Sequence, residues 1–179
     1  MKGFLALSRA IDDLNRGFGW IADALVLLAC LISAGNAVSR YLFNISSNAW
    51  LEIQWYMFSG IFLLGAAYTL KKNEHVRVDI LYSAVGPRGR LYIDIFGILF
   101  FLLPSMLFLA WSSWHFFYSS FIFSEGSSNA GGLLRWPVKI LMPVGFLSVA
   151  LQGISELIKR IAALRSLISV DTEYEKPVQ

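Results

Sequence analysis

The chain has 179 residues, of which 56% are hydrophobic and 15% are charged, and its mean hydropathy is +0.59. Soluble domains carry about 25% charged residues, so this composition indicates a membrane protein. The formal net charge of +3 does not indicate nucleic-acid binding, because the sequence has no basic stripe with interleaved aromatic residues. Cys30 is the only cysteine, which excludes an intramolecular disulfide and a CxxC redox pair.

The N-terminal residues have the pattern of an amphipathic helix. Charged side chains lie off an apolar stripe with three- and four-residue spacing, and the stripe consists of Phe4, Leu7, Ile11, Leu14 and Phe18. We therefore predict an interfacial helix at residues 3–17 that lies flat on the membrane. A cleaved signal peptide is the rival interpretation. The late start and the length of the following apolar stretch disfavour it, and no small-residue cleavage site follows.

Four apolar segments are long enough to cross a bilayer. They cover about residues 20–43, 51–70, 91–118 and 136–158. The uncharged run at residues 95–124 exceeds a hydrocarbon core of about 30 Å, so the third segment must tilt or project, and Pro104 predicts a kink in it. Residues 124–132, SEGSSNAGG, predict a flexible outer loop. The sequence thus predicts one all-α membrane domain at residues 1–168, followed by a disordered tail at 169–179.

The distribution of basic residues predicts the orientation. The N-terminal segment, the hinge at residues 71–90 and the C-terminal segment carry three, five and four of the 15 basic residues. The two opposite loops and their flanks carry only Arg40, Arg135 and Lys139. Because Lys and Arg are retained on the cytoplasmic side, we predict that both termini, the hinge and the tail are cytoplasmic.

The sequence offers little for catalysis. Only two histidines, His75 and His115, occur, and the predicted topology places them at opposite membrane faces, where they cannot ligate one haem together. A serine–histidine pair at one depth and a cysteine-rich metal site are also not indicated. We therefore predict that the chain is not an enzyme and binds no cofactor or metal.

Several segments together resemble one family, the small DctQ-type membrane subunits of tripartite ATP-independent periplasmic (TRAP) transporters. The resemblance rests on RYLFN at residues 40–44, Trp50 with Glu52, FLLGAAYTLKKNEHVRVDIL at 62–81, and WPVKILMPVGFLSVALQGISELIK at 136–159. It extends from the first span to about Arg160. Many members carry paired acids at the start of the second helix, whereas Ile53 and Gln54 follow Glu52 here.

The resemblance implies a function. In such transporters a periplasmic binding protein captures an organic acid, and a large membrane subunit moves it with a sodium gradient. The small subunit would be a scaffold for the large subunit in the bacterial inner membrane, with sialic acid or a C4-dicarboxylate as the leading substrates. The alternative is a small homo-oligomeric transporter or channel, which would need a polar pathway through the membrane. A membrane enzyme is the third and weakest class.

Two groups of residues are candidates for contacts outside the chain. For a partner interface we predict Arg40, Trp50, Glu52, Gly60, Gly65 and Ala66. Arg40 either faces a partner or snorkels to the headgroups, and the small residues pack either on a partner helix or within the chain. For anionic lipid headgroups on the cytoplasmic side we predict Lys71, Lys72, Arg77, Arg88 and Arg90.

Overall fold

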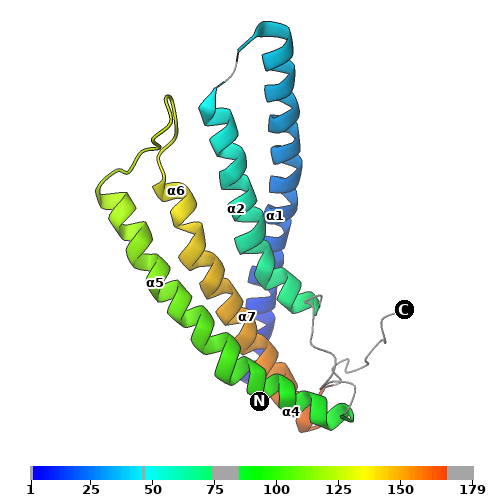
Figure 1. The fold of residues 1–179 in the computed structure, drawn as a ribbon. Helices are drawn as coiled ribbons and strands as arrows, with labels where there is room; N and C mark the ends of the chain where they lie inside the picture. Colours follow the sequence, from blue (N-terminus) through cyan, green and yellow to red (C-terminus); the bar gives the residue numbers. More distant parts are fainter. Residues whose placement is uncertain (1, 46, 74–84, 169–179) are drawn as a thin grey trace.

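The computed structural model describes residues 2–45, 47–73 and 85–168, and the regular elements in these ranges are helices apart from one isolated β-bridge (Figure 1). Four helical segments are long and apolar enough to cross a membrane. They are Gly3–Phe43, Asn48–Lys72, Pro87–Ile122 and Trp136–Leu164. The predicted all-α fold with four spans is therefore confirmed. The predicted tail at 169–179 lies outside the described residues.

Helix α1 runs without a break from Lys2 to Phe43. At 1.5 Å per residue its 42 residues extend about 63 Å, twice the hydrocarbon thickness of a bilayer. The sequence predicts two separate elements here, an interfacial helix at 3–17 and a span at 20–43. The structure joins them into one helix. That residues 3–17 lie in the membrane interface stays a prediction.

The N-terminal part of α1 packs through polar residues as well as apolar ones. Ser8 and Asn15 are buried, with 2% and 0% of their surface exposed. Ile11 is the one buried residue of the predicted apolar stripe. Three other stripe residues remain exposed, namely Phe4, Leu7 and Leu14. The orientation of this part of α1 is therefore set by polar contacts with the rest of the chain.

Helix α2 covers Asn48–Lys72 and starts earlier than the predicted residue 51. The Ser47 hydroxyl accepts a hydrogen bond from the Ala49 N–H at 3.3 Å, which caps the first turn. The helix ends at Asn73, whose φ of 62° lies in the left-handed region that asparagine tolerates. Helices α1 and α2 form an antiparallel hairpin (Figure 1).

The third span is a composite helix. It consists of α4 (Pro87–Gly97), the π-helical turn η1 (Ile98–Leu102) and α5 (Leu103–Ile122). Pro104 has no N–H to donate, and in an α-helix its ring clashes with the carbonyl four residues earlier. The Leu103 N–H bonds the Ile98 carbonyl, five residues back, so the chain widens just before the proline. The structure has this π turn just before Pro104, where the sequence predicted a kink.

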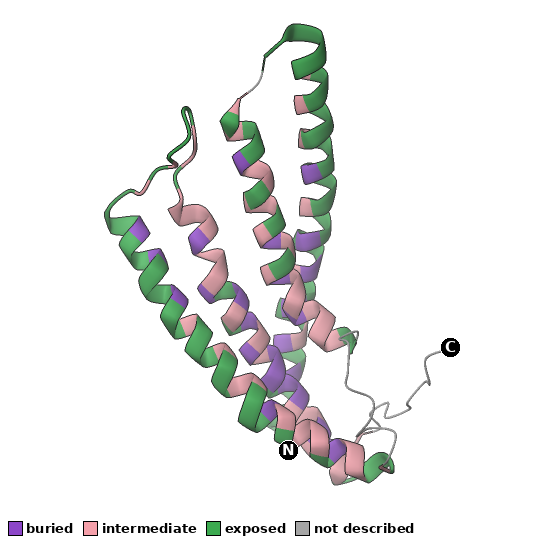
Figure 2. Cartoon of the chain, viewed as in Figure 1, coloured by how far each residue is buried: buried purple, intermediate pink, exposed green. Residues whose placement is uncertain are grey.

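The fourth span consists of α6 (Trp136–Lys139) and α7 (Leu141–Leu164), so α7 continues beyond the predicted end at residue 158. Helix α7 is the centre of the fold, because it packs against α1, α2, α4 and α5. Buried residues concentrate on α7, while the outward face of α5 is exposed (Figure 2).

Glycines on α7 allow its neighbours to come close. A Cβ added to Gly145 would lie 2.8 Å from the backbone oxygen of Leu63 in α2. A Cβ on Gly153 would lie 2.6 Å from a methyl carbon of Leu102 in η1. Such small-residue contacts are the usual basis of helix packing in lipid, where hydrophobicity alone does not drive association.

The α1–α2 hairpin and the α5–α7 pair lie close together at the end that holds α4 and the N-terminus (Figure 1). They separate toward the opposite end, where the segment 123–135 follows α5 (Figure 1). Polar clusters connect the two halves at both ends.

Candidate functional site

Gln152 is the centre of a buried polar cluster between α1 and α7. Its side chain is fully buried and makes three hydrogen bonds. Its Nε2 donates to Asp12 Oδ1 at 3.0 Å and to Glu156 Oε1 at 3.1 Å, while its Oε1 accepts from Asn15 Nδ2 at 2.8 Å. Because Nε2 donates to two carboxylates, which cannot donate in return, the side-chain nitrogen of Gln152 must face them and its oxygen must face Asn15.

Ion pairs extend this cluster along α7. Lys159 Nζ lies 2.7 Å from Asp12 Oδ2 and 2.8 Å from Glu156 Oε1. Arg160 Nε lies 2.7 Å from Asp94 Oδ2 in α4, and its Nη1 donates to Glu156. Three acidic side chains are thus paired with two cations that are mostly buried.

A third cation and a pair of hydroxyls complete the cluster. Lys71 at the end of α2 donates to the Asp12 backbone oxygen at 2.8 Å. Ser155 donates to Asp12 Oδ1 at 2.7 Å, and the hydroxyls of Ser8 and Ser155 are 2.7 Å apart. We call this set the α7 network. It comprises Ser8, Asp12, Asn15, Lys71, Asp94, Gln152, Ser155, Glu156, Lys159 and Arg160.

The sequence-based interpretation missed the α7 network. A signal for it was present, since Gln152, Ser155, Glu156 and Lys159 recur at three- and four-residue intervals on one helix. The complementary residues on α1 have the same spacing, but nothing in either pattern says which two helices meet.

At the other end of the molecule, Glu52 holds the segment after α5. Only 4% of the Glu52 surface is exposed, although the residue lies in the second turn of α2. Its Oε1 accepts hydrogen bonds from the Ser127 hydroxyl and from Asn129 Nδ2, the latter at 2.8 Å. Its Oε2 accepts from the Leu133 N–H at 2.7 Å. One carboxylate therefore satisfies three donors from one loop.

The loop itself has a defined fold. Gly126 and Leu134 form an isolated antiparallel bridge, and the Ser127 N–H donates to the Leu133 oxygen at 2.9 Å. Tyr56 donates to the Leu134 oxygen at 2.6 Å. We call Glu52 together with residues 124–135 the Glu52 clasp. The loop predicted at 124–132 thus has an internal bridge and hydrogen bonds to Glu52, and its flexibility stays a prediction.

Two further contacts fasten the clasp. Asn48 donates to the Ala130 oxygen at 3.0 Å, from the first residue of α2. Lys139 forms an ion pair with Glu125 and lies 3.8 Å from the centre of the Phe116 ring. Because the Lys139 ammonium donates to the carboxylate, the pKa of Glu125 lies below its ordinary value.

The predicted partner-interface residues divide into two groups. Arg40 and Trp50 are exposed, as an interface requires, whereas Glu52 is buried and its carboxylate binds the chain's own loop. A Cβ on Gly60 would lie 2.7 Å from Leu25 of α1. The last two predicted residues, Gly65 and Ala66, line shallow hollows beside α2. Gly60 thus packs within the chain, and an interface at the remaining positions stays a prediction.

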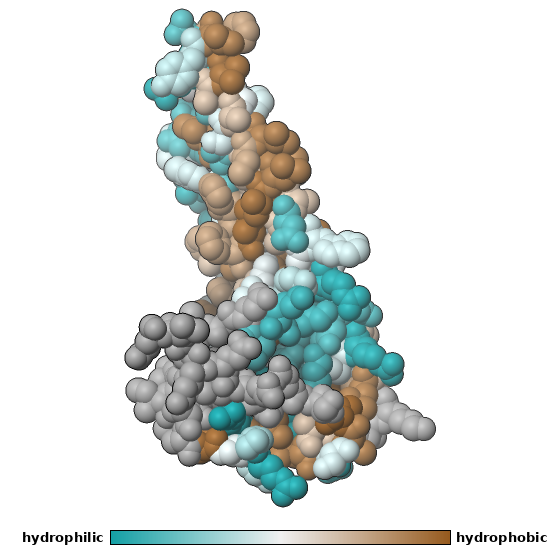
Figure 3. Space-filling view, turned by 90° about the vertical axis from the view of Figure 1, so that its right-hand side faces the viewer, coloured by the Kyte–Doolittle hydropathy of each residue, from teal (hydrophilic) through white to brown (hydrophobic). Residues whose placement is uncertain are grey.

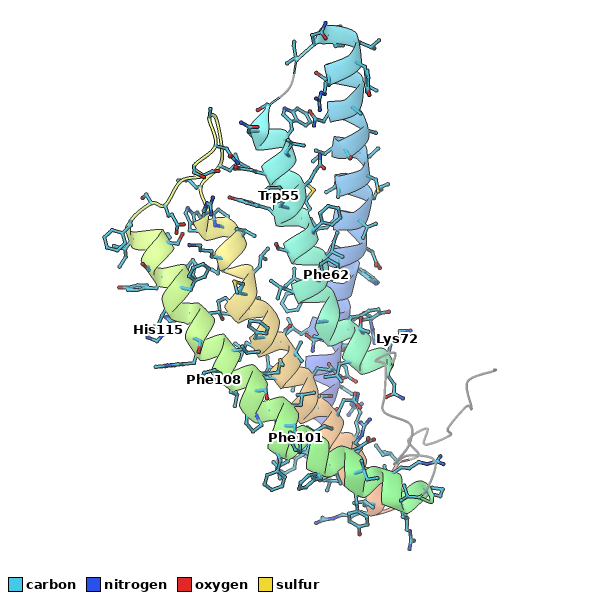
Figure 4. The ribbon with its side chains drawn as sticks, viewed as in Figure 1. Trp55, Phe62, Lys72, Phe101, Phe108 and His115 are labelled. Carbon is cyan, nitrogen blue, oxygen red and sulfur yellow. The ribbon has the colours of Figure 1, made fainter. Side chains whose placement is uncertain are left out.

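The predicted headgroup-binding residues also differ in their surroundings. Lys72 is exposed at the end of α2 (Figure 4) and lies 5.7 Å from the Tyr68 ring centre. Lys71 belongs to the α7 network, and Arg88 is exposed on α4. Arg90 is half-buried, and Arg77 lies outside the described residues.

The charged groups of the α7 network are paired with one another, whereas the Glu52 clasp borders a pocket of about 250 Å³ that is lined by Glu52, Tyr56 and Arg135 among others. In the described ranges, no group of three or more His, Cys, Asp or Glu side chains is arranged to hold a metal ion. A hollow of about 570 Å³ between helices is lined by apolar residues of α2, η1, α5 and α7. Phe101 of η1 and Phe108 and His115 of α5 point away from the other helices (Figure 4).

Comparison with known proteins assigns the family. Residues 28–163 match the family described as tripartite ATP-independent periplasmic transporters, DctQ component, and this range is more than half of the chain. The chain belongs to the DctQ family. The match begins in the middle of α1 and ends in the last turn of α7, so it includes parts of all four spans.

Two named proteins are similar in sequence to this DctQ chain. It is 33% identical over 87 residues to the C4-dicarboxylate TRAP transporter small permease protein DctQ of Vibrio cholerae, a match that covers 48% of this chain and 38% of the relative. It is 29% identical over 77 residues to a putative TRAP transporter small permease protein of Haemophilus influenzae, covering 43% and 48%. The chain thus matches less than half the length of either relative. No solved structure matches it.

These findings establish a multi-pass membrane protein whose relatives are transporter permease subunits. Family membership was predicted correctly from the order of weak motifs. The α7 network and the Glu52 clasp were not predicted, because both depend on contacts between segments that are distant in the sequence.

Proposed function

We propose that this DctQ chain is the small permease subunit of a TRAP transporter and acts as a scaffold for the large membrane subunit. The observation that carries the proposal is the family match over residues 28–163. In this proposal a periplasmic binding protein delivers the substrate, and the large subunit moves it with a sodium gradient. The complex lies in the bacterial inner membrane, with both termini of the small subunit in the cytoplasm.

The distribution of polar groups supports a scaffold rather than a conducting unit. The buried charges of the α7 network are paired with one another near one end of the helices. Glu52 is satisfied by its own loop near the other end. Both clusters stiffen the connection between α1–α2 and α5–α7, which suits a lateral brace. A transporter that worked alone would need ionisable groups lining a path between the two ends.

The substrate belongs to the organic acids. A C4-dicarboxylate is the first candidate, because the relative from Vibrio cholerae is named for that substrate class. Sialic acid is the second candidate. In either case the small subunit holds no substrate site, and selection takes place in the binding protein and the large subunit. Lys72 and Arg88, which are exposed on α2 and α4, then face anionic headgroups on the cytoplasmic side.

A tagged pull-down tests the proposal. The chain is extracted from its native membranes in mild detergent, and proteins that purify with it are identified by mass spectrometry. We expect one large polytopic subunit in a fixed ratio, and loss of organic-acid uptake by cells when the small subunit is deleted. A chain that purifies only with copies of itself and supports uptake in liposomes would instead establish the homo-oligomeric transporter.

A further inference from the structure

One side of α1 carries two charged residues, Asp23 and Arg40, with small or medium-sized residues between them. The residues follow one another at three- and four-residue intervals, so they share one face of the helix. They are Asp23, Val26, Cys30, Ser33, Ala37 and Arg40, and all six are exposed. We call them the α1 stripe. From Asp23 to Arg40 the stripe extends about 26 Å at 1.5 Å per residue, which is close to the thickness of the hydrocarbon core.

The adjacent side of the same helix has the composition of a lipid-facing surface. Leu27, Leu31 and Leu42 are 62%, 59% and 70% exposed, and Ala24 and Val38 lie on the same side. Figure 3 shows the α1–α2 hairpin from this direction, with a strongly apolar band along one edge of its upper part and weakly apolar or hydrophilic residues along the other. Large aliphatic side chains pack well against lipid tails, whereas a face with charged residues at both ends does not.

The two charges of the stripe have no partner among the residues that the structure describes. In the segments that the structure describes, neither Asp23 nor Arg40 forms an ion pair or a side-chain hydrogen bond. A charged side chain exposed on a membrane-crossing helix is costly unless it reaches water or is paired. Snorkelling to the headgroups would account for Arg40 alone. A partner that pairs with both ends of the stripe would account for both charges.

A shallow groove lies beside the N-terminal end of the stripe. It has a volume of about 380 Å³ and lies between α1 and α2. Asp23 and Val26 belong both to this groove and to the stripe, and Gly65, Ala66 and Thr69 line the α2 side. Larger side chains also line the groove, namely Ile61, Phe62 and Tyr68, so it can receive side chains of a partner helix. Asp23 lies at this groove, at the N-terminal end of the stripe.

We propose that the α1 stripe is the docking surface for one transmembrane helix of the large membrane subunit. This inference rests on the function proposed above. The partner helix carries a cationic side chain at the depth of Asp23 and an acidic side chain at the depth of Arg40. Between these two charges, the partner helix carries small residues that leave space for the side chains of the stripe.

Charge complementarity selects a different chain rather than a second copy as the occupant. Two copies inserted in the same orientation and related by a two-fold axis would place Arg40 beside Arg40 and Asp23 beside Asp23. Like charges at both ends disfavour that contact in a medium with little screening. A partner with the opposite charge order pairs both residues at once.

Position 30 permits a direct test, because Cys30 lies at the middle of the stripe. A photoreactive benzoylphenylalanine replaces Cys30 during synthesis, so that the probe is in place before the complex assembles, and native membranes that contain the whole transporter are irradiated. The matched control carries the same photoreactive residue at position 31, on the lipid-facing side. We expect a covalent adduct whose mass and peptides identify the large subunit from position 30, and at most a trace from position 31.

Two other outcomes would overturn the inference. One is an adduct between two copies of this chain. The other is that positions 30 and 31 crosslink to the large subunit equally, or that neither position does, although the pull-down still recovers the large subunit. That second result would reject the docking surface and leave the scaffold function intact. Loss of the large subunit from the pull-down would reject the scaffold function itself.

Two alanine positions on the same helix provide an independent test. Ala37→Trp puts a large side chain on the stripe, whereas Ala24→Trp puts it on the lipid-facing side, and both native residues are exposed. We expect Ala37→Trp to reduce recovery of the large subunit about tenfold, because close packing is lost. Ala24→Trp should leave recovery unchanged. Equal recovery in both variants, with both proteins inserted at normal levels, would contradict the proposal.

Discussion

The α7 network and the Glu52 clasp connect the same two halves of the molecule in different ways. The α7 network joins helices directly, through opposite charges and amides that are buried between α1, α4 and α7. The Glu52 clasp joins a helix to a loop, through one carboxylate and neutral donors. Ion pairs between rigid helices determine where the helices lie, whereas the carboxylate determines the shape of a loop. Damage to the network should therefore affect the whole fold, and damage to the clasp should stay local.

The largest effect is expected from Arg160→Met in the α7 network. The change leaves the carboxylates of Asp94 and Glu156 with less compensation in a buried position. Breaking one partner of a buried pair costs about 3–5 kcal/mol, so the unfolding midpoint in detergent should fall strongly. The exposed Arg165→Met serves as the control, and Arg160→Met/Asp94→Asn should recover part of the loss. Equal midpoints for both arginine variants would show that the network does not determine stability.

The next effect is expected from Glu52→Ala in the clasp. Three hydrogen bonds to the carboxylate are lost, and all three hold the same loop. The amide of Leu133 should then exchange its hydrogen at least tenfold faster, while the amides of α7 keep their protection. Ser127→Ala, which removes one of the three donors, should show a smaller change, and the exposed neighbour variant Ser128→Ala none. Uniform loss of protection in all helices would contradict a local role.

A smaller effect is expected from Gly132→Ala. A Cβ at this position would overlap the Ser127 side chain and lie 2.9 Å from Glu52 Oε1. Overpacking of this kind costs about 1–3 kcal/mol, and we expect local loosening of the loop in hydrogen exchange. Gly126→Ala is the matched control, because a Cβ there meets no atom within 4 Å. If both variants behave alike, the close approach at Gly132 has no energetic importance.

The smallest effect concerns the pH dependence of the Glu125–Lys139 contact. The pKa of Glu125 is lowered in the folded chain by the Lys139 ammonium, from an ordinary value of 4.5. The ion pair therefore contributes to stability above pH 4.5, and this contribution disappears as the pH falls through the lower, folded pKa. The difference in unfolding midpoint between the wild type and Glu125→Gln should be small at pH 7 and vanish in acid. A difference that grows on acidification would reverse the assigned sign.

The sequence by itself determined the number of spans, the family and the apolar surfaces. Long uncharged segments can satisfy their backbone polar groups in lipid only as helices, so hydropathy and length were enough to predict four spans. The order and spacing of several weak motifs were enough to indicate the DctQ family, which the match over residues 28–163 confirmed. Each of these properties depends on residues that are close together in the chain.

Only the tertiary structure decided which polar residues meet. Asp12 and Gln152 are 140 positions apart, and Glu52 and Leu133 are 81 positions apart. An isolated segment does not show whether a carboxylate at its end faces water, a partner or another part of the same chain. For this reason Glu52 was predicted as a partner contact, although its carboxylate binds the chain's own loop, and residues 3–17 were predicted as an element separate from the span that follows them, although α1 is continuous. The packing of α1 against α7, and of the loop against α2, decided which polar groups meet, since buried polar groups must find partners wherever the fold provides them.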